Sequence, residues 1–112
     1  MSAVRYFTGA DGRTHWEELE SLSRYLAANR ISLQPTEQIG LRRYANHQDV
    51  DWHNCPRRQL VFVLSGEVDY EIGDGTRRRF PVGSVLLFED TTGQGHVTRH
   101  FGDFCAAVVP LE

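Results

Sequence analysis

The sequence contains no lysine, and all 12 of its basic residues are arginine. They stand against 15 acidic residues, which gives a net charge of −3 when the histidines are neutral. A chain with this balance lacks the basic face that recognises phosphate backbones or anionic lipid. We therefore expect neither nucleic acid nor a membrane surface among its partners.

Cysteine and long apolar runs are also scarce. The two cysteines, Cys55 and Cys105, are too few for a disulfide framework. No secretory signal opens the sequence, and no apolar run approaches the roughly 18 residues that a membrane span requires. With 112 residues, the chain has the common size of one domain. We expect a single soluble domain in a reducing cytoplasm.

The first third of the sequence carries two different patterns. Residues 4–7 are rich in apolar side chains and precede a turn signal at residues 9–12, which predicts an edge strand and a turn. Further on, apolar side chains recur every three or four residues, at Trp16, Leu19, Leu22 and Leu26. Thr14 and Glu17 have the spacing of a capping box. We therefore expect one short helix over residues 15–28, packed as a lid on the body of the domain.

Beyond residue 38 the pattern changes to that of an antiparallel sheet. Residues 29–38 have no sustained period and predict a connector, and residues 46–51 predict a polar loop. Stretches of β-type composition, separated by glycine turns, cover residues 39–45, 59–64, 67–72, 77–79, 85–88, 96–100 and 104–109. Many short strands of this kind are typical of an all-β sandwich or barrel. We expect one domain, residues 1–112, in which an N-terminal extension (residues 1–38) precedes a barrel core (residues 39–110).

The middle strands carry the clearest signals. Residues 59–64 are apolar on both faces, so we expect this strand in the interior, followed by a turn at Ser65-Gly66. The next strand alternates apolar side chains with Glu67, Asp69 and Glu71, which predicts one buried and one wet face. Asp74-Gly75 then predicts a two-residue type I′ hairpin turn. The arginines of residues 77–79 are expected to pair with the acidic side chains across this hairpin.

The stretch of residues 52–66 organises the candidate site, and here the chain resembles a known superfamily. The first motif of the cupin superfamily is His-x-His, three or four residues, Glu, six residues and Gly. In this sequence it becomes His53-x-Cys55, three residues, Gln59, six residues and Gly66. More narrowly, the run Trp-His-Asn-Cys-Pro-Arg-Arg-Gln in this stretch is similar to a group of small bacterial single-domain cupins of undefined function.

The second cupin motif is matched less closely. Its glycine is present as Gly83, but Glu89 stands where a proline is expected. The motif histidine arrives as His96, two positions late, and His100 stands where an asparagine is expected. The resemblance implies a cupin-type double-stranded β-helix, the RmlC-like jelly roll. It does not imply one activity, because cupins include dioxygenases, isomerases, cyclases, lyases, sugar binders and sensor domains.

The resemblance also implies a metal site inside the barrel. Alternation along a strand places His53 and Cys55 on one side, and the resemblance turns Gln59 and His96 to the same interior. Imidazole, thiolate and amide oxygen can bind a divalent transition metal such as zinc, iron, manganese or nickel. Cys55 is the only anion available: as a thiolate it gives a site with one position open to water, and as a thiol it leaves a weak neutral site. The alternative is a metal-free barrel mouth in which Cys55 is a small buried side chain.

Four further residues are candidates for binding a small-molecule substrate. Arg57 and Arg58 lie on the loop over the predicted barrel mouth, where a guanidinium fork can hold a carboxylate or phosphate. The alternative for each is a solvated or interface arginine. Trp52 can stack on a planar ligand or pack in the core. His100 shares a strand face with His96 and can line the pocket as a hydrogen-bond donor or proton shuttle.

The sequence thus predicts a small cupin that binds a divalent transition metal and acts on a small organic metabolite, with the reaction left open. The alternatives are a metal-free cupin that binds or senses a small ligand, and a barrel with a structural or assembly role. A homodimer is expected in each case, by resemblance and because Leu60, Phe62 and Leu64 need cover on the outer face of the sheet. His15 and His47 are expected at the surface, outside the site.

Overall fold

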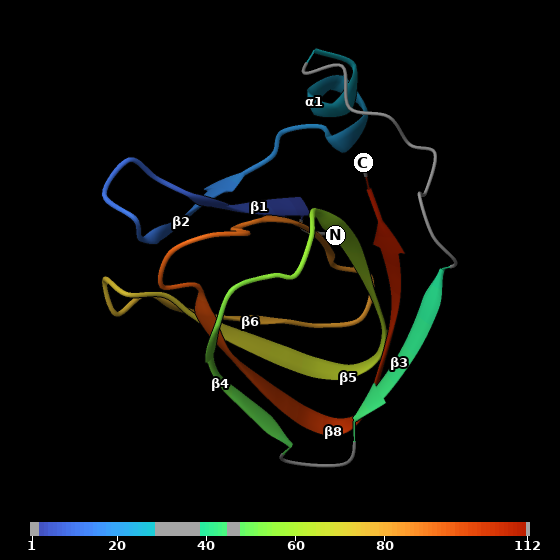
Figure 1. Cartoon of the computed structure of the whole chain (residues 1–112). Helices are drawn as coiled ribbons and strands as arrows, with labels where there is room; N and C mark the ends of the chain where they lie inside the picture. The colour runs from blue at the N-terminus through green and yellow to red at the C-terminus, as the bar shows by residue number, and fades with distance from the viewer. Residues whose placement is uncertain (1–2, 29–38, 45–47, 112) are drawn as a thin grey trace.

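The strands of this protein join in one sheet. The computed structural model describes residues 3–28, 39–44 and 48–111, and the eight strands of this part follow the order β2-β1-β7-β5-β8-β3, with β4 on β8 and β6 on β5. They are β1 (Ala3–Thr8), β2 (Thr14–Glu18), β3 (Gly40–Tyr44), β4 (Asp49–His53), β5 (Gln59–Glu71), β6 (Arg77–Phe80), β7 (Val85–Glu89) and β8 (His96–Pro110). These strands pair antiparallel except β1 with β7, which is parallel. Figure 1 shows the sheet curving round, with α1 (Leu22–Ala28) outside it.

Two long strands, β5 and β8, form the centre of the sheet. They span 13 and 15 residues and pair with each other along most of their length. The predicted turn at Ser65-Gly66 is wrong, because β5 continues through it with a register shift against β8 between Val63 and Glu67. Gly66, whose φ is 69°, bends the strand instead of reversing it. The two strands predicted near the end of the sequence are likewise one strand, β8.

The helix predicted over residues 15–28 is half wrong. Its first part is strand β2, in which Trp16 pairs with Tyr6 of β1, and its second part is α1. Pairing with β1 satisfies the backbone of β2, so a neighbouring strand overrides the helical spacing. The helix begins after Ser21, whose hydroxyl accepts a hydrogen bond from the Arg24 backbone N–H at 3.2 Å. Within the described residues, no helix is long and apolar enough to cross a membrane.

The capping box predicted at Thr14 and Glu17 does not form. Thr14 is buried, and its hydroxyl donates to Asp90 Oδ2 at 3.1 Å. Glu17 pairs instead with Arg5 of β1, at 3.0 Å. The segment predicted as an N-terminal extension therefore contributes two strands, and β1 lies directly against β7.

Part of the polar loop predicted at residues 46–51 is also a strand. Residues 49–51 belong to β4, which among the described strands pairs with β8 alone and is therefore an edge strand. An edge strand tolerates polar side chains because it meets solvent, which explains why the segment has the composition of a loop. The strand predicted over residues 39–45 is confirmed over Gly40–Tyr44, as β3, and residue 45 lies outside the described residues. Residues 46–47 and the predicted connector of residues 29–38 lie outside the described residues.

The hairpin predicted at Asp74-Gly75 is confirmed, with a different turn. β5 and β6 are antiparallel neighbours, and the Gly75 N–H donates to the Ile72 carbonyl oxygen at 3.0 Å. Gly73 and Asp74 are therefore the central residues of the turn. Gly75, with a φ of 90°, follows them and closes a three-residue loop.

Ion pairs line the outer face of this hairpin, as the alternating charges predict. Arg77 contacts Asp69 at 3.0 Å, and Arg79 approaches Glu67 at 3.7 Å. Arg78 differs, because it pairs with Glu18 of β2. Arg77 and Arg79 thus join β6 to its neighbour β5, whereas Arg78 links β6 to β2, with which it does not pair in the sheet.

The core has two parts, one on each face of the sheet. The inner part is rich in aromatic side chains and includes Tyr6, Val68, Tyr70, Ile72, Phe80, Leu86, Phe88 and Phe104. The outer part consists of Leu60, Val85, Leu87 and Leu111, and Leu22 and Tyr25 of α1 pack against it. Leu60 is thus covered by the chain's own helix, whereas Leu64 is 50% exposed. Of the three apolar side chains that were expected to need cover, only Leu64 and half-buried Phe62 still leave apolar surface exposed. The homodimer stays a prediction.

Gly66→Ala tests the bulge that bends β5. A Cβ at this position would lie 2.7 Å from the Phe101 carbonyl oxygen and 2.8 Å from Phe104 Cα. We expect the free energy of unfolding in urea to fall by more than about 2 kcal/mol. Gly12→Ala is the matched control, because Gly12 also has a positive φ (74°) but no atom within 4 Å of such a Cβ, and a loss of about 1 kcal/mol is expected there. Equal losses would show that the close approach has no energetic consequence.

Candidate functional site

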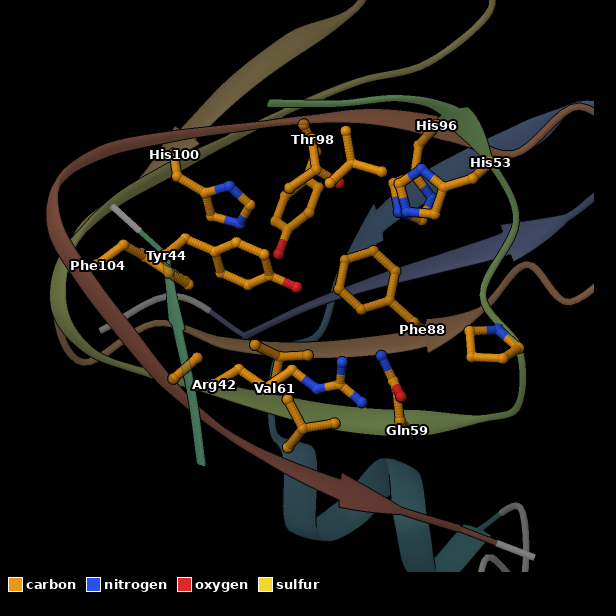
Figure 2. Close-up of a pocket in the computed structure, with 15 residues that line it drawn as sticks. Arg42, Tyr44, His53, Gln59, Val61, Phe88, His96, Thr98, His100 and Phe104 are labelled. Carbon is orange, nitrogen blue, oxygen red and sulfur yellow. The ribbon is translucent and has the colours of Figure 1, made fainter. Parts of the chain in front are cut away.

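A cavity of about 250 Å³ lies inside the curved sheet. Figure 2 shows its walls, to which β3, β4, β5, β7 and β8 contribute side chains. Aliphatic and aromatic groups form much of the lining, and the polar side chains in it are Arg42, Tyr44, His53, Gln59, Tyr70, His96, Thr98 and His100. Among the described residues, the lining contains no aspartate or glutamate. The volume is below the roughly 300–1,000 Å³ of typical ligand pockets, so the cavity suits a small metabolite.

His96, the first residue of β8, is held by a buried carboxylate. Its Nδ1 lies 2.5 Å from Asp90 Oδ2, and the Asp90 side chain is completely buried. A carboxylate only accepts hydrogen bonds, so Nδ1 carries a proton, and in the neutral imidazole Nε2 is the nitrogen with the lone pair. Phe88 stacks on the imidazole at 5.0 Å between ring centroids, and Tyr70 meets it edge to face at 5.6 Å. The ring is therefore fixed in orientation and in tautomer.

His53 lies beside His96. The resemblance to the cupin motifs implies that both side chains face the interior of the barrel. The two residues are opposite each other in the β4–β8 pair, and their ring centroids are 4.6 Å apart. His53 Nδ1 lies 2.7 Å from the Asp51 carbonyl oxygen, which can only accept, so Nδ1 carries a proton and the neutral ring has its lone pair on Nε2. Figure 2 shows the two rings together at one end of the cavity.

Gly95 makes this close pairing possible. Its φ is 76°, and a Cβ on it would overlap the carbonyl oxygen of His53. The loop between β7 and β8 therefore passes directly against the His53 backbone just before His96 begins its strand. A glycine is required at this point because any larger residue would push the two histidines apart.

Of the other two predicted metal ligands, Gln59 lines the cavity and Cys55 does not. Cys55 packs in the inner core and is 4% exposed. Burial, together with the nearby charge of Asp90, raises the pKa of its thiol to about 12. Cys55 is therefore a neutral thiol at pH 7, and the predicted set of four converging side chains is reduced to three.

These three donors fit a divalent metal poorly. Two imidazole nitrogens and the Gln59 amide oxygen bring no negative charge to offset the hydration that the cation loses. Among the residues that the structure describes, no group of three or more histidine, cysteine, aspartate or glutamate side chains is arranged to hold a metal ion. Arg42 also places a positive charge in the same lining. The binding of a zinc, iron, manganese or nickel ion stays a prediction. The ligands that this chain supplies for such an ion are weak.

His100 lines the cavity on the strand face that it shares with His96 and Thr98, as predicted. Its ring stacks on Tyr44 with centroids 4.0 Å apart and an interplanar angle of 8°. Its Nδ1 lies 2.5 Å from the Gln48 carbonyl oxygen. Burial lowers the pKa of His100, so this imidazole is neutral at pH 7 and forms an uncharged wall of the cavity.

The three predicted substrate contacts near the first motif lie outside the cavity lining. Arg58 is held by Glu89, with Nε 2.8 Å from Oε2, and Arg5 contacts the other oxygen at 2.6 Å. Burial alone would raise the pKa of Glu89, but these two hydrogen bonds outweigh it and lower the pKa. Arg58 thus has a structural role. Arg57 is half-buried away from the cavity, and Trp52 is 41% exposed.

Arg42 is a cavity residue that the sequence analysis missed. It lies on β3 two positions before Tyr44, and both side chains line the cavity. Strand alternation turns the intervening Arg43 outward, where it pairs with Asp103 at 3.0 Å, and Leu41 is 74% exposed. Because Tyr44 faces the cavity, alternation along the strand turns Arg42 inward as well. The inward Tyr44 is the signal that distinguishes Arg42 from Arg43.

Comparison with known proteins identifies the fold. No protein-family model and no curated protein matches the sequence. A cupin superfamily protein from Desulfitobacterium hafniense DCB-2 is similar in structure, with a TM-score of 0.55 and 19% identity over 74% of this chain and 78% of that chain. A conserved protein of unknown function from Streptococcus pyogenes has a TM-score of 0.53 and 20% identity over 74% and 71%, and a protein from Neisseria meningitidis has 0.51 and 19% over 85% and 100%. The chain therefore has the all-β cupin fold.

Proposed function

We propose that the protein binds a small organic molecule in this cavity and exchanges a proton with it through His96. The observation that supports the proposal is the buried Asp90–His96 pair, whose imidazole lies in the lining of a metabolite-sized cavity. A carboxylate on one ring nitrogen fixes the imidazole and stabilises the cation that forms when the other nitrogen takes a proton. This arrangement is suited to general acid–base chemistry.

Asp90 supplies its charge where water does not screen it. Oδ2 accepts hydrogen bonds from Thr14 and His96, while the buried Oδ1 makes no hydrogen bond within the described residues. A buried oxygen without a partner costs about 1–3 kcal/mol, and such costs call for an explanation in a native protein. An unscreened carboxylate acts strongly on any charge that His96 gains during proton transfer, which explains why the cost is tolerated.

His53 adds a second acceptor to the site. In the neutral imidazoles both Nε2 atoms carry lone pairs, so a ligand that reaches the two rings from the cavity must present a hydrogen-bond donor such as a hydroxyl or an amine. One imidazole then holds this donor while the other takes or returns a proton. The aromatic rings of Phe88 and Tyr70 cover His96 and exclude water from it. Proton exchange of the kind used by isomerases and lyases is the reaction class that this geometry favours.

His96→Gln tests the proposal. The wild-type protein, incubated in heavy water with a small-molecule cell extract, is expected to incorporate deuterium into the compound on which it acts, as measured by mass spectrometry. The variant keeps a polar side chain but loses the base, so the exchange should slow by about 10²–10⁴-fold. His15→Gln is the matched control, because His15 pairs with Asp11 at the surface, outside the cavity lining, and should leave the rate unchanged. Equal exchange in wild type and His96→Gln, or none in either, would contradict the proposal.

A divalent transition metal held by His53 and His96 is the second candidate. It is favoured by one observation, that each ring donates its Nδ1–H to an oxygen, as metal-binding histidines commonly do. Elemental analysis after growth with zinc, iron, manganese and nickel separates the candidates. Because the available donors are neutral, we expect less than about a tenth of an equivalent. Near-stoichiometric metal that His96→Ala removes would instead establish the second candidate.

Cys55 provides an independent check on the donor set. Its raised pKa, about 12, keeps the thiol protonated at about pH 8, and its burial shields it from reagents. A thiol reagent should therefore modify half-buried Cys105 in the native protein and both cysteines after unfolding. Cys105→Ser should show no labelling before unfolding. Rapid native labelling in that variant would identify Cys55 as an accessible thiolate and would restore it as a ligand.

A further inference from the structure

Arg42 brings a positive charge to a cavity whose lining, in the part of the chain that the structure describes, holds no carboxylate. A guanidinium stays ionised at every pH that a folded protein meets. Figure 2 shows it pointing into the cavity near Gln59, and its side chain is exposed, so an anion can reach it from solvent. Within the part of the chain that the structure describes, Arg42 has no hydrogen bond or ion pair, whereas the adjacent Arg43 pairs with Asp103. An inward arginine of this kind is suited to bind an anionic ligand.

Two neighbouring polar groups are also available to such a ligand. The Gln59 amide and the Tyr44 hydroxyl line the cavity, and neither makes a hydrogen bond with the other described residues. Figure 2 shows both side chains reaching into the same cavity as Arg42. A planar carboxylate accepts two parallel hydrogen bonds from a guanidinium and keeps lone pairs for an amide or hydroxyl donor. The three groups together therefore match a carboxylate.

The rest of the lining favours an organic acid over an inorganic anion. Figure 2 shows the Phe88 ring between Arg42 and the imidazoles, and Val61 beside Arg42, so both present apolar surface to a ligand. An inorganic anion leaves this surface uncovered, whereas an aromatic or aliphatic body buries it and gains the corresponding hydrophobic free energy. At the far end, the free lone pairs of His53 and His96 require a hydrogen-bond donor on the ligand.

We propose that the ligand is a small hydroxycarboxylic acid. Its carboxylate pairs with Arg42, its apolar body lies against Phe88, and its hydroxyl reaches His53 and His96. This assignment rests on the proposed function of the cavity and names its substrate class. Arg42 is then the residue that selects acids over their neutral analogues.

The test compares two probes of nearly equal shape, 4-hydroxybenzoate and 4-hydroxybenzamide, by ligand-observed NMR titration, with inorganic phosphate as a third probe. The wild-type protein should bind the acid at least about tenfold more tightly than the amide. Arg42→Gln should weaken binding of the acid by about 10- to 100-fold and leave the affinity for the amide unchanged. Arg42→Lys keeps the charge without the planar fork and should retain part of the preference.

Arg43→Gln is the matched control, because it removes an outward arginine from the same strand and should bind both probes as the wild type does. Equal affinity for acid and amide, or an unchanged preference in Arg42→Gln, would overturn the role of Arg42 and leave the small-molecule function of the cavity intact. Phosphate binding as tight as that of the acid, with the same dependence on Arg42, would overturn the organic-acid class. Failure of both organic probes to bind would also overturn the organic-acid class. The proposed function would still be tested separately, by the deuterium incorporation that depends on His96. Thermal unfolding of each variant checks that the fold is retained.

Discussion

The buried carboxylate of Asp90 is the interaction on which the site depends. It lies between Thr14 of β2 and His96 of β8, and the Asp90 backbone oxygen accepts a hydrogen bond from the Cys55 N–H at 3.0 Å. A carboxylate removed from water is costly unless such partners compensate it. One residue therefore connects the N-terminal strand pair, the segment after β4 and the start of β8. The orientation of His96 follows from this connection, so the fold and the proposed chemistry share the same contact.

The charge in the cavity follows from three positions. The first cupin motif commonly supplies histidine and glutamate where this chain has Cys55 and Gln59, and Cys55 turns into the core as a neutral thiol. Arg42 then adds a fixed positive charge to a lining in which residues 3–28, 39–44 and 48–111 place no carboxylate. These changes act in the same direction, because they make the cavity less suited to a cation and more suited to an anion. The two imidazoles keep their free lone pairs at the other end, so the cavity offers one cationic group and two neutral acceptors to the same small ligand.

Much of the fold can be predicted from the sequence, because residues close together in the chain determine many of its turns and strands. The hairpin between β5 and β6 follows from alternation and from Asp74-Gly75, and the resemblance to the cupin motifs implies that His53 and His96 share one interior. The predicted helix over residues 15–28 is half wrong because pairing with β1 satisfies the backbone of β2, and no local pattern records that pairing. The prediction that Cys55 faces the same side as His53 fails because β4 ends at His53. The backbone from His53 to Cys55 is no longer an extended strand, so side chains do not alternate there. Composition does not distinguish Arg42 from the adjacent Arg43. Arg42 could be found only by knowing which alternate side chains of β3 face the cavity.

Side-chain nitrogen NMR tests the arrangement of the site most directly. In the free protein, we expect His53 and His96 to show the tautomer with the proton on Nδ1, as their oxygen partners require. On saturation with 4-hydroxybenzoate, the Nε2 resonances of both rings should shift, while those of surface His15 should not. A proton on Nε2 of His96 in the free protein, or Nε2 resonances of His53 and His96 that stay unchanged when the acid is bound, would contradict a ligand held between Arg42 and the two histidines.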